Sequence, residues 1–356
     1  MDPVVAAPSR APAVSTDKRD ALCQESRMVW LWLGFTALVV VLLVLDLGVF
    51  HRSAHEVSLR EATAWTLVWI TLGLAFTGVV YIIYKEHWFG AHLETVGATK
   101  PGQAALLYVT GYVLEKSLSV DNIFVISVIF RSFRVEPRYR HRVLFWGIIG
   151  AIVLRAAMIL GGAWLVHRFA WVFYIFGLYL AYTGVKLFRD KGSEVDPETS
   201  AFIRVARRCL PVAREDHGSQ LLAREGTKPV LTRLGLVLIA VEGTDVIFAL
   251  DSIPAILAIT TDSFIVFTSN IFAILGLRSL YFILEGMMGR FRHLQVALAF
   301  VLVFIGAKML LHDVYVFPNL VSLGIILGAV TLGVLTSLLG DRADAQEQPP
   351  AKSDVT

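Results

Sequence analysis

The sequence predicts an all-α polytopic membrane protein with about nine transmembrane helices, among them two inverted three-helix repeats. First, 56% of its 356 residues are hydrophobic and only 17% are charged, with a mean hydropathy of +0.66. That balance is far more apolar than is usual for a soluble domain. Second, the apolar runs are continuous rather than alternating, which favours helices over a barrel. Third, charged residues recur at matching positions in two sets of three runs.

Nine apolar stretches are long enough to cross a bilayer, because a helical span needs about 20 apolar residues. In chain order they are residues 28–50, 61–84, 103–130, 142–167, 169–188, 231–260, 262–287, 293–311 and 320–340. The fourth and fifth are separated only by His167 and Arg168.

The spans form two membrane halves, residues 28–188 and 231–340, joined by a loop over 189–230. Within this loop "DPETSAFIRVARRCLP" predicts a short helix, with Asp196 as its cap and Pro211 beyond its end. We expect a polar N-terminal tail over 1–27 and a disordered C-terminal tail over 341–356.

Basic residues gather in alternate loops and predict the orientation. The loop after the third span, "RSFRVEPRYRHR", holds five Arg, and the 189–230 loop holds eight Lys or Arg. Loops rich in Lys and Arg lie in the cytoplasm. A chain that crosses the plasma (inner) membrane nine times then has its N-terminus outside the cell and its C-terminus in the cytoplasm.

A repeat is visible in the charged residues of the spans. Residues 114–128, "LEKSLSVDNIFVISV", align with residues 244–258, "TDVIFALDSIPAILA", so that Glu115 matches Asp245 and Asp121 matches Asp251. In the next two spans Arg155 matches Arg278 and Lys186 matches Lys308. Residues 103–188 and 231–311 are therefore predicted to be repeats. An odd number of spans reverses direction, so the second repeat would enter the membrane the opposite way, as in many secondary transporters.

Five carboxylates lie inside the two corresponding spans, and they are the candidate metal ligands: Glu115, Asp121, Glu242, Asp245 and Asp251. Each costs about 2.5–3.5 kcal/mol at the centre of a membrane helix unless something compensates its charge. They therefore need a shared cation, protonation or basic partners.

Helical geometry places Glu242 and Asp245 on one face, whereas Asp251 lies about 120° from Asp245 in projection. Pro254 removes the backbone hydrogen bond to Leu250, so we expect an unwound turn near Asp251 that turns side chains and carbonyls inward.

The candidate supporting ligands are Asn122, Ser252 and Thr244. Together with the carboxylates they make an all-oxygen set suited to Mn²⁺, Mg²⁺ or Ca²⁺. His and Cys are absent from the two motif spans, which argues against zinc and copper.

A structural alternative stays open, in which the acids pair with basic residues that pin the bundle. The candidate charge partners are Lys116, Arg155, Arg278, Lys186 and Lys308. A mixed role is also consistent, with these groups neutralising the acids when metal is absent. For Asp46, near the end of the first span, an interfacial ion pair with Arg52 is at least as good a reading as a place in the pathway.

Other function classes find little support. The chain has no nucleotide-binding motif, no nucleophile–base pair and no zinc motif. We expect a protein that is not an enzyme and carries no cofactor. The net charge of +3 gives no reason to expect nucleic acid, and Cys23 and Cys209 lie outside the apolar runs. The expected partners are a metal ion, as substrate, and the lipid bilayer.

The motif segments resemble a known family. "EKSLSVDNIFV", "EGTDVIFALDSIPAI" and "SNIFAILGLRSLYF", with "LDLGVF" in the first span, closely resemble the signature segments of the TerC family and are nearest to its Alx-like members. The resemblance covers about residues 28–340 and includes all five acidic positions.

The resemblance implies an inner-membrane protein of the LysE-like transporter superfamily, linked to manganese export and to tellurium resistance. It carries the five acids over as the family's acidic motif residues. We therefore expect Mn²⁺ efflux by alternating access, with proton exchange as a candidate coupling. Two alternatives remain: a transporter for another cation such as Ca²⁺, and a membrane scaffold in the metal or tellurium stress response.

Overall fold

The computed structural model describes residues 15–50, 58–86, 88, 100–189, 201–209, 211–213, 218, 220–225, 228–285, 292–315 and 317–347. The helices are α1 (Ser15–Phe50), α2 (Leu59–Lys85), α3 (Pro101–Ser132), α4 (Pro137–Arg168), α5 (Trp171–Arg189), α6 (Ala201–Cys209), α7 (Arg233–Leu257), α8 (Ser263–Ile274), α9 (Leu277–Glu285), α10 (Arg292–Leu310) and α11 (Asn319–Glu347). Strands β1 (Leu222–Glu225) and β2 (Lys228–Leu231) form an antiparallel hairpin.

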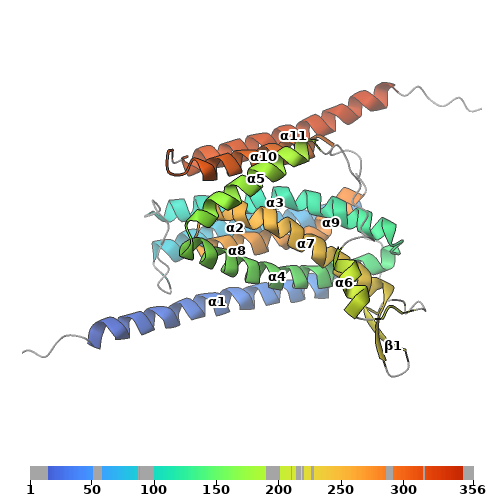
Figure 1. The fold of residues 1–356 in the computed structure, drawn as a ribbon, viewed down its shortest axis with the longest axis horizontal. Helices are drawn as coiled ribbons and strands as arrows, with labels where there is room; N and C mark the ends of the chain where they lie inside the picture. The colour runs from blue at the N-terminus through green and yellow to red at the C-terminus, as the bar shows by residue number, and fades with distance from the viewer. Residues whose placement is uncertain are drawn as a thin grey trace, which may run out of the picture.

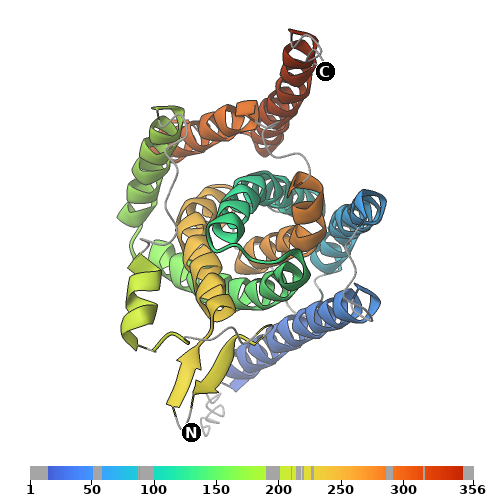
Figure 2. The ribbon, with the colours of Figure 1, turned by 90° about the vertical axis from the view of Figure 1, so that its right-hand side faces the viewer.

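The long helices lie side by side, and α6 and the hairpin lie together at one end of the bundle (Figure 1). Figure 2 shows α3, α4, α7 and the α8–α9 pair at the centre. Helices α1 and α2 lie on one side of this centre, and α5, α10 and α11 lie on another. The two motif helices, α3 and α7, are thus enclosed by other helices.

Five helices of the described chain are long and apolar enough to cross a membrane: α1, α2, α4, α5 and α11. The α8–α9 pair makes a sixth if it counts as one bent span. The nine predicted ranges also contain α3, α7 and α10. The apolar part of α10, Gln295–Leu310, is short, and α7 carries Glu242, Asp245 and Asp251 within its length. The motif helices therefore stand apart because of the acids they carry.

Glu115, Asp121, Glu242 and Asp245 lie between two apolar clusters of the described chain, and Asp251 lies at the edge of the first. One cluster contains α3 up to Leu114 and α7 from Ala249 onward. The other contains α3 from Ile123 onward and α7 up to Val241. The polar segments of both helices are therefore held in the middle of the bundle, with apolar packing on either side along the helix axes.

The chain between the membrane halves differs from expectation at the start of the sixth span. The sixth span was expected to begin at residue 231, but residue 231 ends β2 and α7 begins at Arg233. Thr232 caps this helix, because its hydroxyl accepts a hydrogen bond from the Gly235 N–H at 3.0 Å. The expected helix within 189–230 is present as α6, whereas Asp196 and Pro197 lie outside the described residues.

The C-terminal tail was expected to be disordered from residue 341, but α11 continues to Glu347. The segment "DRADAQE" contains two Ala together with Arg, Gln and Glu, which favour helix. Residues 348–356 lie outside the described chain.

The helix break falls at a different place from the one expected. Helix α7 stays helical through Asp251 and Pro254, because this proline lies in its last turns and removes a single backbone hydrogen bond. The seventh span, expected to be continuous, instead breaks between α8 and α9 with a bend of 42°. Gly276 occupies the break with a φ of 82°, which favours glycine.

The helices of the two predicted repeats contact one another in a reciprocal pattern. Helix α3 packs on α8, α4 packs on α7, and α5 packs on α10. The first crossing brings Gly111 against Ser269, and the second brings Gly147 against Val241. Val241 occupies the position in the second repeat that Gly111 occupies in the first. Each crossing therefore uses a glycine on one of its two helices.

Candidate functional site

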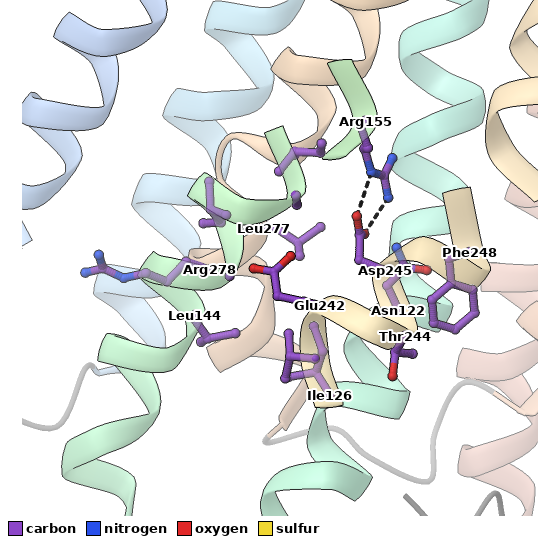
Figure 3. Close-up of a pocket in the computed structure, with 15 residues that line it drawn as sticks. Asn122, Ile126, Leu144, Arg155, Glu242, Thr244, Asp245, Phe248, Leu277 and Arg278 are labelled. Carbon is purple, nitrogen blue, oxygen red and sulfur yellow. Dashed lines mark hydrogen bonds and ion pairs between the residues drawn. The ribbon is translucent and has the colours of Figure 1, made fainter. Parts of the chain in front are cut away.

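A buried ion pair joins three helices at the centre of the bundle. In Arg155 of α4, Nη2 lies 2.7 Å from Asp245 Oδ1 and Nε lies 3.1 Å from Asp245 Oδ2 (Figure 3). Its Nη1 donates to Glu115 Oε1 and, at 3.2 Å, to Asn270 Oδ1. The side chains of Arg155 and Glu115 are each only 1% exposed. Two of the five predicted metal ligands are therefore paired with an internal cation.

Two cavities lie next to this ion pair. The first, here called the α4–α7 cavity, has a free volume of about 30 Å³ and is bordered by Arg155, Glu242, Thr244, Asp245 and Arg278, among others. Figure 3 shows the Glu242 carboxylate and the Asp245 side chain on the same side of α7, both within this cavity. The cavity has room for about one water molecule.

The second cavity, here called the α3–α7 cavity, has a free volume of about 80 Å³. Its polar lining consists of Glu115, Asp121, Asn122, Asp251, Ser252 and Thr183. Asn122 and Phe248 border both cavities, so they form part of the wall between them. The five acids are thus divided, with Glu242 and Asp245 facing one cavity and Glu115, Asp121 and Asp251 facing the other.

Several oxygen atoms around the α3–α7 cavity are buried without a hydrogen-bond partner in the described chain. They are Glu115 Oε2, Asn122 Oδ1, Asp251 Oδ1 and Ser252 Oγ. Buried polar atoms are nearly always hydrogen-bonded, so an unpaired group of this kind calls for an explanation such as a bound ion or water. All four atoms belong to the repeated motif that the sequence singled out.

Glu242 lies against α4 at a glycine. A Cβ atom on Gly150 would overlap the Glu242 carboxylate, and Glu242 Oε2 is buried without a hydrogen-bond partner in the described chain. The absence of a side chain at Gly150 is therefore what makes room for this carboxylate between α4 and α7.

The five acids do not converge on one point. In the part of the chain that the structure describes, no group of three or more His, Cys, Asp or Glu side chains is close enough to hold one metal ion. The expected unwound turn would have drawn Asp251 inward, but α7 is helical there. The arrangement offers carboxylates, an amide and hydroxyls around two small cavities rather than one complete coordination sphere.

The proposed charge partners have different roles. Arg155 pairs with two of the acids, whereas Arg278 contacts Asp46 Oδ2 of α1 at 3.4 Å. Lys116 Nζ donates to the backbone carbonyl of Ala273 at 3.1 Å. Lys186 lies near Asp251, and no ion pair is recorded for Lys308 within the described residues.

For Asp46, both an interfacial ion pair with Arg52 and a place in the pathway were expected as alternatives. Asp46 is only 8% exposed and contacts Arg278, while Arg52 lies outside the described residues. The "LDLGVF" segment therefore brings a carboxylate into the interior.

Sequence analysis missed three polar contributors to the site. Asn270 accepts from Arg155, and Thr183 lines the α3–α7 cavity. The hydroxyls of Tyr179 and Thr183 are within hydrogen-bonding reach of Asp251. Asn270 had a visible signal, because it is an amide in an otherwise apolar helix and follows the "NIF" pattern of Asn122. The two hydroxyl residues of α5 had none.

Comparisons with known proteins agree with the resemblance seen in the motifs. A family model described as "Integral membrane protein TerC family" matches residues 100–345. A protein of Myxococcus xanthus named "Uncharacterized membrane protein STKORF319" is 48% identical over 88% of this chain and 93% of its own length.

Two further relatives, from Salmonella typhi and Escherichia coli K12, both bear the name "Putative membrane-bound redox modulator Alx". They are 45% and 43% identical over 85% and 89% of this chain, and the matches cover 92% and 97% of their own lengths. No solved structure matches the chain significantly.

Proposed function

Because the chain belongs to the TerC family of integral membrane proteins, we propose that it is a divalent cation transporter that exports Mn²⁺ across the bacterial inner membrane. The observation that carries the proposal is the set of buried, unpaired oxygens around the α3–α7 cavity. Carboxylate, amide and hydroxyl oxygens are the donors that Mn²⁺, Mg²⁺ and Ca²⁺ prefer. The family resemblance selects manganese among these ions.

The transport pathway would run through the two cavities. They meet at Asn122 and Phe248, and the apolar clusters close the bundle on either side of them. A small site enclosed near the middle of the membrane is what alternating access requires. An ion would enter one cavity from the cytoplasm and leave from the other, with protons binding to the freed carboxylates.

Inverted repeats would supply the two states. The helix pairs α3–α8 and α4–α7 exchange with each other when the repeats are swapped, and α5–α10 maps onto itself. This reciprocity supports a two-fold relation between residues 103–188 and 231–311. Three spans in each repeat would give the two repeats opposite directions in the membrane, and the distribution of Lys and Arg favours nine spans with the N-terminus outside. The wider assignment to the LysE-like superfamily stays part of this proposal.

Transport into liposomes tests the proposal. Purified protein would be reconstituted with a Mn²⁺-sensitive dye inside the vesicles, and Asp121→Asn and Asp251→Asn would be compared with the wild type. Loss of a residue that merely supports metal ligands typically lowers metal affinity about 10–100-fold, so we expect each variant to transport Mn²⁺ at least about tenfold more slowly at limiting ion concentration.

Glu86→Gln is the matched control, since Glu86 is an exposed carboxylate whose only recorded ion pair in the described chain is with Lys85 at the surface. Its transport should equal that of the wild type. Equal or faster transport of Ca²⁺ would overturn the manganese assignment. Unchanged Mn²⁺ transport by both site variants would remove Asp121 and Asp251 from the pathway. Absence of Mn²⁺ transport by the wild type would support the scaffold alternative, in which the acids only pin the bundle.

The relatives' name suggests a second candidate, a redox role. In this chain the cysteines, Cys23 and Cys209, belong to α1 and α6 and not to the motif helices. The polar groups at the centre of the bundle are oxygen donors, and they favour cation transport over redox chemistry.

A further inference from the structure

The two buried arginines at matching repeat positions have different partners. Arg155 of α4 is held by Glu115 and Asp245, here called the carboxylate pair. Arg278 of α9 is 4% exposed and contacts Asp46 of α1. Figure 3 shows Arg278 extending away from Asp245, although both residues border the α4–α7 cavity.

Swapping the repeats maps the carboxylate pair onto itself. Glu115 takes the place of Asp245 and Asp245 takes the place of Glu115, whereas Arg155 is replaced by Arg278. In a transporter with inverted repeats, the opposite-facing state is approximately the present one with the two repeats exchanged. In that state the arginine facing the pair is Arg278.

We propose that Arg155 and Arg278 hold the carboxylate pair in turn, one in each of the two opposite-facing states, and that Asp46 holds Arg278 aside while Arg155 is engaged. The inference rests on the alternating access of the proposed function but not on the identity of the ion. Its physical basis is that two buried carboxylates are strongly unfavourable without a cation beside them. An exchange of arginines keeps them neutralised in both end states.

The second repeat differs from the first at the place this exchange requires. Helix α4 is continuous through Arg155, whereas the chain breaks between α8 and α9 at Gly276, two residues before Arg278. Rotation at such a break would change the direction of Arg278 without disturbing α8.

Helices outside the repeats hold α9 in its present orientation. The Thr66 hydroxyl of α2 donates to the Ser279 hydroxyl at 3.0 Å. The Trp69 side chain of α2 packs so closely on Gly276 that a Cβ atom there would lie 2.6 Å from it. With Asp46 of α1, these contacts give α1 and α2 a function, since they belong to neither repeat. They stabilise the state in which Arg278 is held aside.

Cysteine accessibility tests the exchange. In a Cys23→Ser/Cys209→Ser background, Ala151→Cys would report on the α4–α7 cavity and Leu187→Cys on the α3–α7 cavity. The readout is the ratio of the two maleimide labelling rates, measured in native membranes. Arg155→Gln should favour the state held by Arg278, and Arg278→Gln should favour the present state. We therefore expect their ratios to shift in opposite directions from the unsubstituted background, by about tenfold between the two variants.

Asp46→Asn is the decisive variant, because Asp46 lies on a peripheral helix and contacts neither carboxylate of the pair within the described chain. It should shift the ratio in the same direction as Arg155→Gln, since it releases Arg278. Adding Arg278→Gln to Asp46→Asn should return the ratio to that of Arg278→Gln alone. If Asp46→Asn behaves like Arg278→Gln, the two residues form only a structural contact and the proposal is wrong.

If a glutamine variant does not insert into the membrane, lysine substitutions test the exchange in its place. Lysine keeps the charge but loses the two-pronged geometry of arginine, so Arg155→Lys and Arg278→Lys should shift the ratio in the same opposite directions, but less. Shifts in one direction, or none, would overturn the exchange. Wild-type Mn²⁺ transport is measured separately: if it is absent while the opposite shifts occur, the ion assignment fails and the exchange of arginines stands.

Discussion

At the scale of single residues, the five acids are not equivalent. Glu115 and Asp245 share Arg155, so their charges are already compensated in this state. Asp121 and Asp251 border the α3–α7 cavity without an arginine. These two, at matching repeat positions, are therefore the carboxylates most available to an incoming cation.

Gly150→Ala provides a test of Glu242 that leaves its charge intact. The added methyl group would overlap the Glu242 carboxylate. Because that carboxylate is the far end of a flexible side chain, it can move aside, so we expect a small change in thermal stability. We propose that Glu242 lies on the pathway. Its displacement from the α4–α7 cavity should therefore slow Mn²⁺ transport in the liposome assay by about fivefold or more.

Gly161→Ala is the matched control, because it adds the same methyl group to the same helix where nothing lies within 4 Å. Its transport rate should stay at the wild-type level. Equal rates for the two variants would remove Glu242 from the pathway. A large loss of stability in Gly150→Ala alone would instead mean that Glu242 cannot move.

The types of residue in the site could be predicted from the sequence, but their pairings could not. Charged and amide side chains are easily recognised within apolar runs, and the predicted repeat shows which of them correspond. A pairing depends on which helices meet. Local reasoning offered Arg52 as one candidate partner of Asp46, whereas Asp46 contacts Arg278, 232 positions along the chain. Asn270 was missed for the same reason, since its role depends on Arg155 of another helix.

At the scale of helices, hydrophobic length predicts the elements well and their interruptions poorly. Helices lie over all the predicted apolar stretches, but α1 begins well before its stretch, at Ser15, α11 continues to Glu347, and the seventh stretch holds two helices, α8 and α9. The break was expected at Pro254 because proline lacks an N–H, but α7 continues through Pro254 and ends at Leu257. The actual break, at Gly276, needs a positive φ. The sequence does not show which of its many glycines adopts a positive φ.

Gly306→Ala tests the close packing of α5 against α10. A Cβ on Gly306 would lie 2.6 Å from both the Ala181 backbone nitrogen and the Gly177 carbonyl oxygen. Backbone atoms of a helix cannot move aside alone, so the helices must separate. Overpacking of this kind costs about 1–3 kcal/mol, and we expect a lower midpoint of thermal unfolding in detergent.

Gly324→Ala serves as the control for this substitution. Gly324 lies in α11, and nothing would come within 4 Å of its Cβ. Alanine is favoured over glycine within a helix by about 0.5–1 kcal/mol, so this variant should unfold at the same temperature or higher. If Gly306→Ala were equally stable, α5 and α10 would not be packed as closely as described.

At the scale of the whole molecule, the arrangement is dominated by contacts between its two halves. Helices α3 and α4 pack on α8 and α7, so each half completes the core of the other. The sequence predicts the repeat from charges alone, but it does not predict this exchange of partners, because apolar helix faces carry little information about which other face they meet. The exchange is also what places the carboxylates of both halves next to Arg155.

The direction of the chain in the membrane can be tested with its own two cysteines. Cys23 precedes the first predicted span, and Cys209 follows the fifth. An odd number of spans between them puts the two thiols on opposite sides, and the distribution of Lys and Arg puts Cys209 in the cytoplasm. In spheroplasts, a membrane-impermeant maleimide should therefore label the Cys209→Ser variant, which keeps Cys23, and should not label Cys23→Ser, which keeps Cys209.

Inside-out vesicles should give the reverse pattern, and labelling after solubilisation in detergent serves as the control that both thiols are reactive. Labelling of both single-cysteine variants from the same side would mean that α4 and α5 do not cross separately or that α1 does not cross. Either outcome would make the number of spans before the second repeat even. If α1 does not cross, the repeats keep their opposite directions and only the orientation of the chain changes. If α4 and α5 do not cross separately, the first repeat has two spans and the inverted relation between the repeats fails.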